Sequence, residues 1–120
     1  MKKLLWIIAV IVAIGALTFY FVRQSQKPGQ YDALAQCIEK SGTKFYGAWW
    51  CPHCQAQKAF FGKSAKLLPY VECQTPDQKQ NQTCNDAGIK GYPTWVFPDG
   101  SRITGEQKPA ELAAKTNCPL

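Results

Sequence analysis

Residues 45–54 read Phe-Tyr-Gly-Ala-Trp-Trp-Cys-Pro-His-Cys, and this stretch decides how the rest of the chain is interpreted. Its apolar half predicts a short buried strand, and the Cys-x-x-Cys that follows is expected to open a helix. Pro52 suits the first helical position, where its missing N–H would have been unpaired anyway. A cysteine at a helix start lies at the positive end of the helix dipole, which stabilises the thiolate. Cys51 is therefore the expected nucleophile, and Cys54, one turn on, the expected buried resolving thiol.

A purely structural disulfide and half of a zinc site are the alternatives for Cys51 and Cys54. Zinc is disfavoured because the chain has a single Cys-x-x-Cys and a single histidine, His53. Redox chemistry is the preferred interpretation, with no metal and no cofactor expected. His53 can favour the Cys51 thiolate by hydrogen bonding or by charge, which would make the disulfide more oxidising. The alternative for His53 is an ordinary exposed loop residue.

The apolar run 4–22 is the second decisive feature, because it carries no charge and spans roughly 28 Å as a helix, close to the thickness of a bilayer core. It is longer than the apolar region of a signal peptide, and it ends in bulky residues where a cleavage site needs small ones. We therefore expect residues 1–23 to be an uncleaved single-pass anchor, residues 24–30 a linker and residues 31–120 the folded domain. A cleaved signal peptide and a buried core helix are the alternatives.

Composition indicates where that domain resides. The chain has 120 residues and six cysteines, all of them beyond the apolar run, which favours an oxidising compartment. We expect the C-terminal domain in a periplasm or lumen, at an inner, plasma or thylakoid membrane, and the flanking basic residues bias the N-terminus slightly toward the cytoplasm. The net charge is +6, but from Gln24 onward 11 basic residues face 8 acidic ones. This scattered excess gives little reason to expect nucleic-acid binding.

The remaining residues alternate between helical and strand patterns. The predicted helices cover residues 31–40, 52–68 with a bend at Gly62, 83–87 and 109–115. The predicted strands cover residues 44–49, 70–73, 92–97 and 102–104, the last two joined by a hairpin turn at Pro98-Asp99-Gly100-Ser101. The order is that of an α/β fold.

Together with Gly88-Ile89-Lys90-Gly91-Tyr92-Pro93-Thr94 and Phe97-Pro98-Asp99-Gly100, the opening motif resembles proteins of the thioredoxin fold, in which helices flank a central mixed sheet. The resemblance covers roughly residues 31–120. It looks closest to the thioredoxin-like domain associated with bacterial and plant homologues of vitamin K epoxide reductase (VKOR). It implies a domain that passes disulfides to exported proteins with cysteines and is reoxidised by a membrane quinone reductase of the VKOR or DsbB type.

The resemblance also implies roles for single residues. Pro52-His53 is the dipeptide of periplasmic dithiol oxidases of the DsbA type. Pro93 matches a proline that is cis in the family and lies against the active disulfide. A cis bond there would leave the backbone of Tyr92 free to pair with an extended substrate, and Tyr92 and Trp50 would bind it. Pro93 as a plain turn proline is the alternative.

One position departs from the family. Cytosolic thioredoxins carry a buried aspartate six residues before the first cysteine, and this chain has Phe45 there. The departure disfavours a general reductase, and it leaves the deprotonation of Cys54 without its usual carboxylate.

With Cys51 and Cys54 assigned to the redox pair, we predict structural bridges Cys73–Cys84 and Cys37–Cys118. A second, shuttling role for Cys73–Cys84 stays open. The leading function is an anchored oxidase of exported proteins. The alternatives are an anchored reductase, as in cytochrome c maturation, and a redox-inactive binding module.

Overall fold

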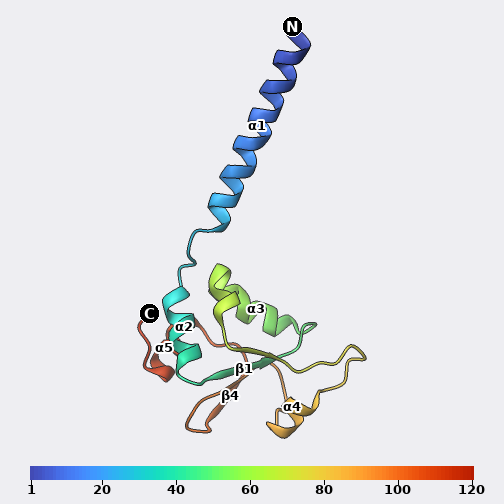
Figure 1. Cartoon of the computed structure of the whole chain (residues 1–120). Coiled ribbons are helices and arrows are strands. Elements are labelled where there is room, and N and C mark those ends of the chain that lie inside the picture. Colours follow the sequence, from blue (N-terminus) through green and yellow to red (C-terminus); the bar gives the residue numbers. More distant parts are fainter.

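Strand β1 (Lys44–Gly47) lies inside the four-stranded sheet of the computed structural model, which describes residues 1–120 (Figure 1). The strand order is β2-β1-β3-β4. Strand β1 runs parallel to β2 (Tyr70–Glu72) and antiparallel to β3 (Thr94–Val96), which pairs antiparallel with β4 (Arg102–Thr104). The mixed sheet confirms the predicted fold class.

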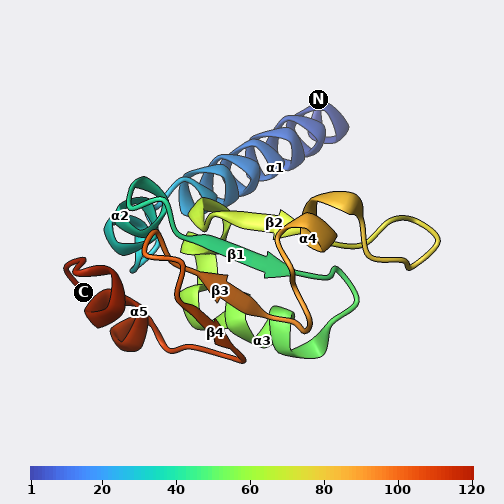
Figure 2. The same ribbon diagram turned by 90° about the horizontal axis from the view of Figure 1, so that it is seen from below.

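The helices pack against one face of this sheet and at one of its ends. Helix α3 (Pro52–Phe61) lies along one face of the sheet, while α2 (Asp32–Lys40) and α5 (Pro109–Thr116) pack together at one end (Figures 1 and 2). The short helix α4 (Gln82–Asp86) follows the long loop after β2. The apolar residues that these elements bury include Leu34, Ile38, Phe61 and Leu112.

The centre of the core is aromatic. The rings of Phe45 and Trp95 stack at 4.7 Å between centroids, and Tyr70 meets Phe45 edge-on at 5.1 Å. Phe45 and Trp95 are fully buried. The three rings come from β1, β3 and β2, so their packing fixes how the middle strands sit under α3.

The structure corrects the long helix predicted for residues 52–68. Helix α3 ends at Phe61, because Gly62 takes a φ of +53°, a conformation that glycine adopts without steric cost. The chain then continues as a 3₁₀ helix, η1 (Gly62–Leu67). Two strands are also shorter than predicted: β1 stops at Gly47, where a turn leads to Cys51, and β3 begins only after Pro93.

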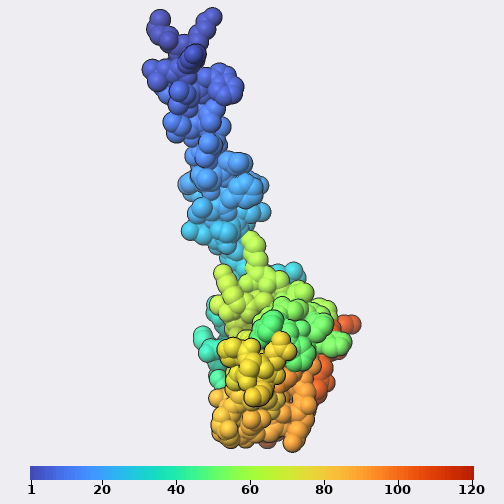
Figure 3. Space-filling model, turned by 90° about the vertical axis from the view of Figure 1, so that its right-hand side faces the viewer, coloured from blue at the N-terminus to red at the C-terminus, as the bar shows by residue number.

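Helix α1 (Lys2–Ser25) projects away from the domain and buries none of its residues (Figures 1 and 3). It is long and apolar enough to cross a membrane, with a mean hydropathy of 2.5 over its most apolar window. Residues such as Leu5, Ile11 and Phe19 are more than half exposed along it. Helix α1 is thus a candidate membrane span.

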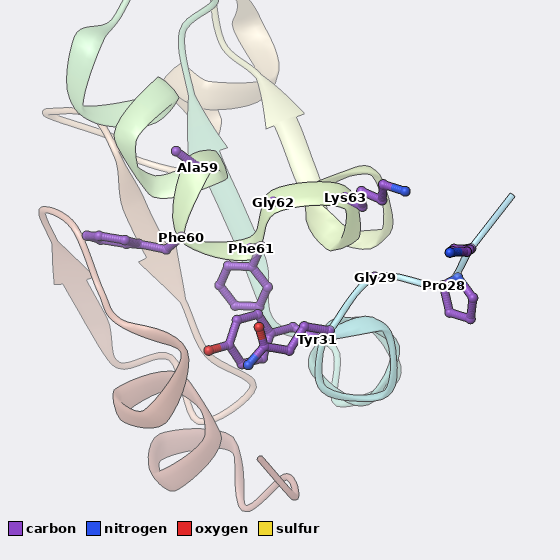
Figure 4. Close-up of a pocket in the computed structure, with 10 residues that line it drawn as sticks. Pro28, Gly29, Tyr31, Ala59, Phe60, Phe61, Gly62 and Lys63 are labelled. Carbon is purple, nitrogen blue, oxygen red and sulfur yellow. The ribbon is translucent and has the colours of Figure 1, made fainter. Parts of the chain in front are cut away.

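The end of α1 and the segment between α1 and α2 are packed against η1. The backbone N–H of Tyr31 donates to Ser64 Oγ at 3.0 Å, and Lys63 Nζ donates to the carbonyl of Gln24 at 2.8 Å. A Cβ on Gly29 would lie 2.2 Å from Ser64 Oγ, so only glycine permits this approach. Figure 4 shows the groove that results, with Pro28 and Gly29 on one side and Gly62 and Lys63 on the other.

Two disulfides are present, and they join the same cysteines that the sequence pattern pairs. Cys37–Cys118 links α2 to the chain just after α5, across 81 residues. Cys73–Cys84 links the end of β2 to α4, across 11 residues. Both sulfurs of the second bridge are fully buried, in a small cluster with Ile89.

Removing the Cys37–Cys118 bridge should destabilise the domain strongly, because it closes the longer loop and ties the two end helices together. Chain-entropy arguments give a loss of about 4 kcal/mol in the free energy of unfolding for Cys37→Ala/Cys118→Ala. Urea unfolding of the full chain in detergent, followed by tryptophan fluorescence, measures it. A loss below about 1 kcal/mol would contradict the expectation.

Candidate functional site

Cys51 and Cys54 lie where the chain passes from β1 into α3, and neither forms a disulfide. Cys51 is the N-cap residue of α3, and Pro52 occupies the first helical position. The backbone N–H of Cys54 donates to Cys51 Sγ at 3.3 Å. An N–H directed at the sulfur, together with the helix dipole, favours negative charge on Cys51. Cys51 therefore occupies the helix-start position at which the sequence predicts the nucleophile.

The two sulfurs differ in their surroundings. Cys51 keeps 4% of its surface exposed, whereas Cys54 is fully buried. Burial raises the pKa of the Cys54 thiol to about 12, and the hydrogen bond with Cys51 acts in the same direction. Cys54 is consequently a thiol that holds its proton until Cys51 has reacted.

The loop before β3 covers the sulfur of Cys51 from the other side. The peptide bond Tyr92–Pro93 is cis, and Cys51 Sγ lies 3.8 Å from the carbonyl oxygen of Tyr92. Neither backbone group of Tyr92 bonds to another backbone group. Its hydroxyl donates to Gln80 and accepts from Gln74 at 3.2 Å, which fastens the ring to the loop after β2.

Aromatic side chains flank this sulfur at the surface. Trp49 is 53% exposed and Trp50 48% exposed, and the ring of Trp50 meets that of Tyr92 edge-on at 6.4 Å. Three hollows occur on the molecule, and none is lined by Cys51 or Cys54. Cys51 thus lies beside exposed aromatic side chains, with little of its own surface exposed.

His53 makes its hydrogen bond away from the cysteines. Its Nδ1 lies 2.7 Å from Glu106 Oε1, and its side chain is 73% exposed. The sequence predicted a hydrogen bond to Cys51 or a charge effect on it. In the structure the hydrogen bond goes to Glu106, and an effect of a His53 charge on Cys51 stays a prediction.

Gln57 is a residue that the sequence pattern did not reveal. It is fully buried in α3; its Oε1 accepts from the N–H of Gln107 at 2.7 Å and from Trp95 Nε1 at 3.3 Å, and its Nε2 donates to the carbonyl of Gln107 at 2.8 Å. These bonds hold the loop that carries Glu106 beside His53. The only feature of the sequence that could have revealed Gln57 is an amide side chain on an otherwise apolar helix face.

No group of three or more His, Cys, Asp or Glu side chains that could hold a metal ion occurs in the structure. The Cys73–Cys84 bridge, fully buried, offers no sulfur for an incoming thiolate to reach. Among the six cysteines, Cys51 is the one that caps the start of a helix.

The reduced protein should react with iodoacetamide at Cys51 well before Cys54. At pH 8, a thiol with a pKa of about 12 is only about 0.01% thiolate, and Cys54 is also shielded from reagent. Timed labelling of the full chain followed by peptide mass spectrometry measures both rates. Labelling of Cys54 should rise about tenfold with each pH unit above 8, because the thiolate fraction does so below the pKa, and equal rates at pH 8 would contradict the geometry.

The sequence model of the thioredoxin family, described as "Thioredoxin", matches residues 30–117. A curated relative, "Thiol-disulfide oxidoreductase LTO1" of Arabidopsis thaliana, is 44% identical over 93 residues, which is 73% of this chain. The chain spans about a quarter (24%) of the length of that relative. A solved structure of thioredoxin (Mala s 13) from Malassezia sympodialis is 23% identical, with a TM-score of 0.45 over 62% of this chain and 70% of that one. On the strength of the family match, the chain belongs to the thioredoxin family.

Proposed function

We propose that this thiol–disulfide oxidoreductase of the thioredoxin family introduces disulfides into exported proteins while anchored to a membrane by α1. The observation that carries the proposal is the asymmetry of the Cys-Pro-His-Cys pair. Cys51 lies at the start of α3 beside an exposed aromatic surface, and Cys54 is buried behind it. The name of the relative that is 44% identical supports the type of chemistry.

Each step of exchange has a sulfur placed for it. A substrate thiolate attacks Cys51 Sγ of the oxidised pair; the Cys51–Cys54 bond breaks, a substrate–Cys51 disulfide forms, and the Cys54 sulfur leaves and takes up a proton. A second substrate thiolate then attacks the substrate sulfur of this mixed disulfide. The substrate disulfide forms and Cys51 departs as a thiolate, which the start of α3 stabilises.

Substrate chains are expected to lie across the loop at Tyr92. Its backbone N–H, which bonds to no other group of the chain, offers the edge of an added strand next to the cis Pro93. The rings of Tyr92 and Trp50 offer apolar contact to residues around a substrate cysteine. An exposed surface of this kind suits an extended or unfolded polypeptide better than a small molecule.

The oxidising direction rests on three features of the chain. Phe45 stands where cytosolic thioredoxins have a buried carboxylate. His53, which bonds to Glu106, lies between the two cysteines of the pair. Two disulfides cross-link the domain. Stable bridges belong to oxidising compartments such as a periplasm or a lumen. A separate quinone-linked membrane enzyme of the VKOR or DsbB type would accept the two electrons and restore the Cys51–Cys54 disulfide.

Helix α1 would hold the domain at that membrane. Its apolar side chains are exposed on all sides, which is costly in water and favourable in lipid. Lys2 and Lys3 precede the apolar run, and Arg23 ends it. This pattern supports a single-pass anchor with its N-terminus in the cytoplasm.

The reduction potential of the Cys51–Cys54 pair tests the direction. Equilibration of the full chain in detergent with glutathione buffers, read by mass tagging of free thiols, should give roughly −180 to −120 mV, the range of disulfide isomerase and strong oxidases. A value near −270 mV, where thioredoxin lies, would replace the oxidase with the anchored reductase. The Cys51→Ser/Cys54→Ser variant is the control, because tags on it report only the two structural bridges.

Replacing His53 should make the pair less oxidising. The imidazole, held by Glu106, favours the Cys51 thiolate and hence the reduced form, so His53→Ala should move the potential about 30–60 mV more negative. Glu106→Gln keeps a hydrogen-bond partner for the imidazole, and it should change the potential less than His53→Ala does. An unchanged or more positive potential in His53→Ala would contradict this role.

A further inference from the structure

The proton of Cys54 has no obvious acceptor, although it must leave each time the disulfide closes. The pKa of this thiol is raised to about 12 by burial, and the position six residues before Cys51 holds the buried ring of Phe45. Apolar packing of that ring against Trp95 and Tyr70 leaves no room for a carboxylate there. Any route for the proton must therefore start elsewhere around the Cys54 sulfur.

Gly47 opens such a route at the end of β1. A Cβ built on Gly47 would lie 3.0 Å from Cys54 Sγ, 2.7 Å from Tyr70 Cε2 and 3.4 Å from Tyr70 Oη. The Cys54 sulfur and the Tyr70 hydroxyl therefore lie around one point that the missing side chain of residue 47 leaves open, and no hydrogen bond joins the two directly. The parallel pairing of β1 with β2, in which Gly47 lies opposite Glu72, creates this juxtaposition.

Glu72 continues the route toward solvent. Tyr70 Oη donates to Glu72 Oε2 at 2.7 Å. The other carboxylate oxygen, Oε1, accepts from the N–H of Trp49 at 3.2 Å and from the N–H of Gln74 at 2.9 Å. Three donors thus fix this carboxylate, and the half-buried Glu72 reaches the surface beside Trp49.

Two more ionisable groups face this cluster. Lys58 of α3 places its Nζ 3.7 Å above the ring centroid of Tyr70, and its charge opposes the burial effect on the Cys54 thiol. Cys51 is the other. The hydroxyl of Tyr70 is itself a poor acid, because burial and the bond to Glu72 raise its pKa, so it is suited to pass a proton on and not to ionise.

We propose that Tyr70 and Glu72 carry the proton of Cys54 during thiol–disulfide exchange. As the Cys54 sulfur attacks Cys51 in a mixed disulfide, its S–H proton passes through one water molecule to Tyr70 Oη, and the proton of Tyr70 passes to Glu72 Oε2. The Cys54–Cys51 bond forms, the bond from Cys51 to the partner sulfur breaks, and the partner leaves as a thiolate. Opening of the disulfide follows the same path in reverse, so the proposal holds for either direction of exchange.

The test separates the two cysteines by kinetics. The full chain in detergent, reduced at Cys51 and Cys54 with its two bridges intact, is mixed with 5,5′-dithiobis(2-nitrobenzoate) in a stopped-flow instrument. The first release of thionitrobenzoate reports the attack of Cys51, and the second reports closure by Cys54. Tyr70→Phe removes the hydroxyl and keeps the ring on Phe45 and Lys58. Glu72→Gln removes the acceptor charge and keeps an oxygen for its backbone donors.

At pH 7 both variants should slow the second release by about 10- to 100-fold, within the range of general acid–base catalysis, and leave the first within about 3-fold. The deficit should shrink as the pH approaches 12, because hydroxide then removes the Cys54 proton directly. Tyr46→Phe is the matched control: it removes a hydroxyl from the same strand as Gly47, and both releases should keep the unmodified rates.

The proposal would be overturned if, in both variants, the rate of the second release stayed within about 3-fold of the rate in the unmodified chain at every pH. An equal slowing of both releases would also overturn it, since that would mark Tyr70 and Glu72 as packing residues. If the unmodified chain released no thionitrobenzoate, the exchange activity itself would fall, and this proposal with it.

Discussion

The burial of the Cys54 sulfur behind Cys51 is the constraint on which the rest of the site depends. A thiolate in an apolar interior is costly, so the inner sulfur stays protonated while the outer one faces the N–H groups that open α3. This difference is created by the chain turn at Ala48–Trp50, which ends β1 and starts the helix within a few residues. A longer β1 would carry Cys51 away from the helix dipole.

The two strands that flank β1 lie beside different cysteines of the pair. On one side, the chain entering β3 places the carbonyl oxygen of Tyr92 3.8 Å from Cys51 Sγ and leaves the N–H of Tyr92 without a partner in the chain. On the other side, β2 brings Tyr70 beside Cys54, with Glu72 leading to the surface. Substrate contact and proton transfer, as proposed, thus occupy opposite edges of one strand and do not compete for space.

The sequence predicted what depends on local pattern, and missed what depends on long-range register. The Cys-x-x-Cys at a helix start and the order of helices and strands follow from motif and periodicity over short windows, whereas the mixed sheet was implied by the family resemblance. The cluster of Gly47, Tyr70 and Glu72 arises only when β1 and β2 pair in one register. The bond from His53 to Glu106 likewise depends on a loop held by the buried Gln57, which no periodicity reveals.

The attachment of the linker to η1 gives the exchange surface a defined position relative to α1. The end of α3 and the start of η1 contact the linker through Ser64 and Lys63, whereas Cys51 lies at the opposite end of α3, roughly 15 Å away by helix rise. If α1 spans a membrane as proposed, the reactive sulfur points away from the anchor. Soluble substrates then meet it directly. A membrane-embedded partner has to extend toward it, or the contacts of Gly29 and Tyr31 with Ser64 have to open so that the domain can tilt.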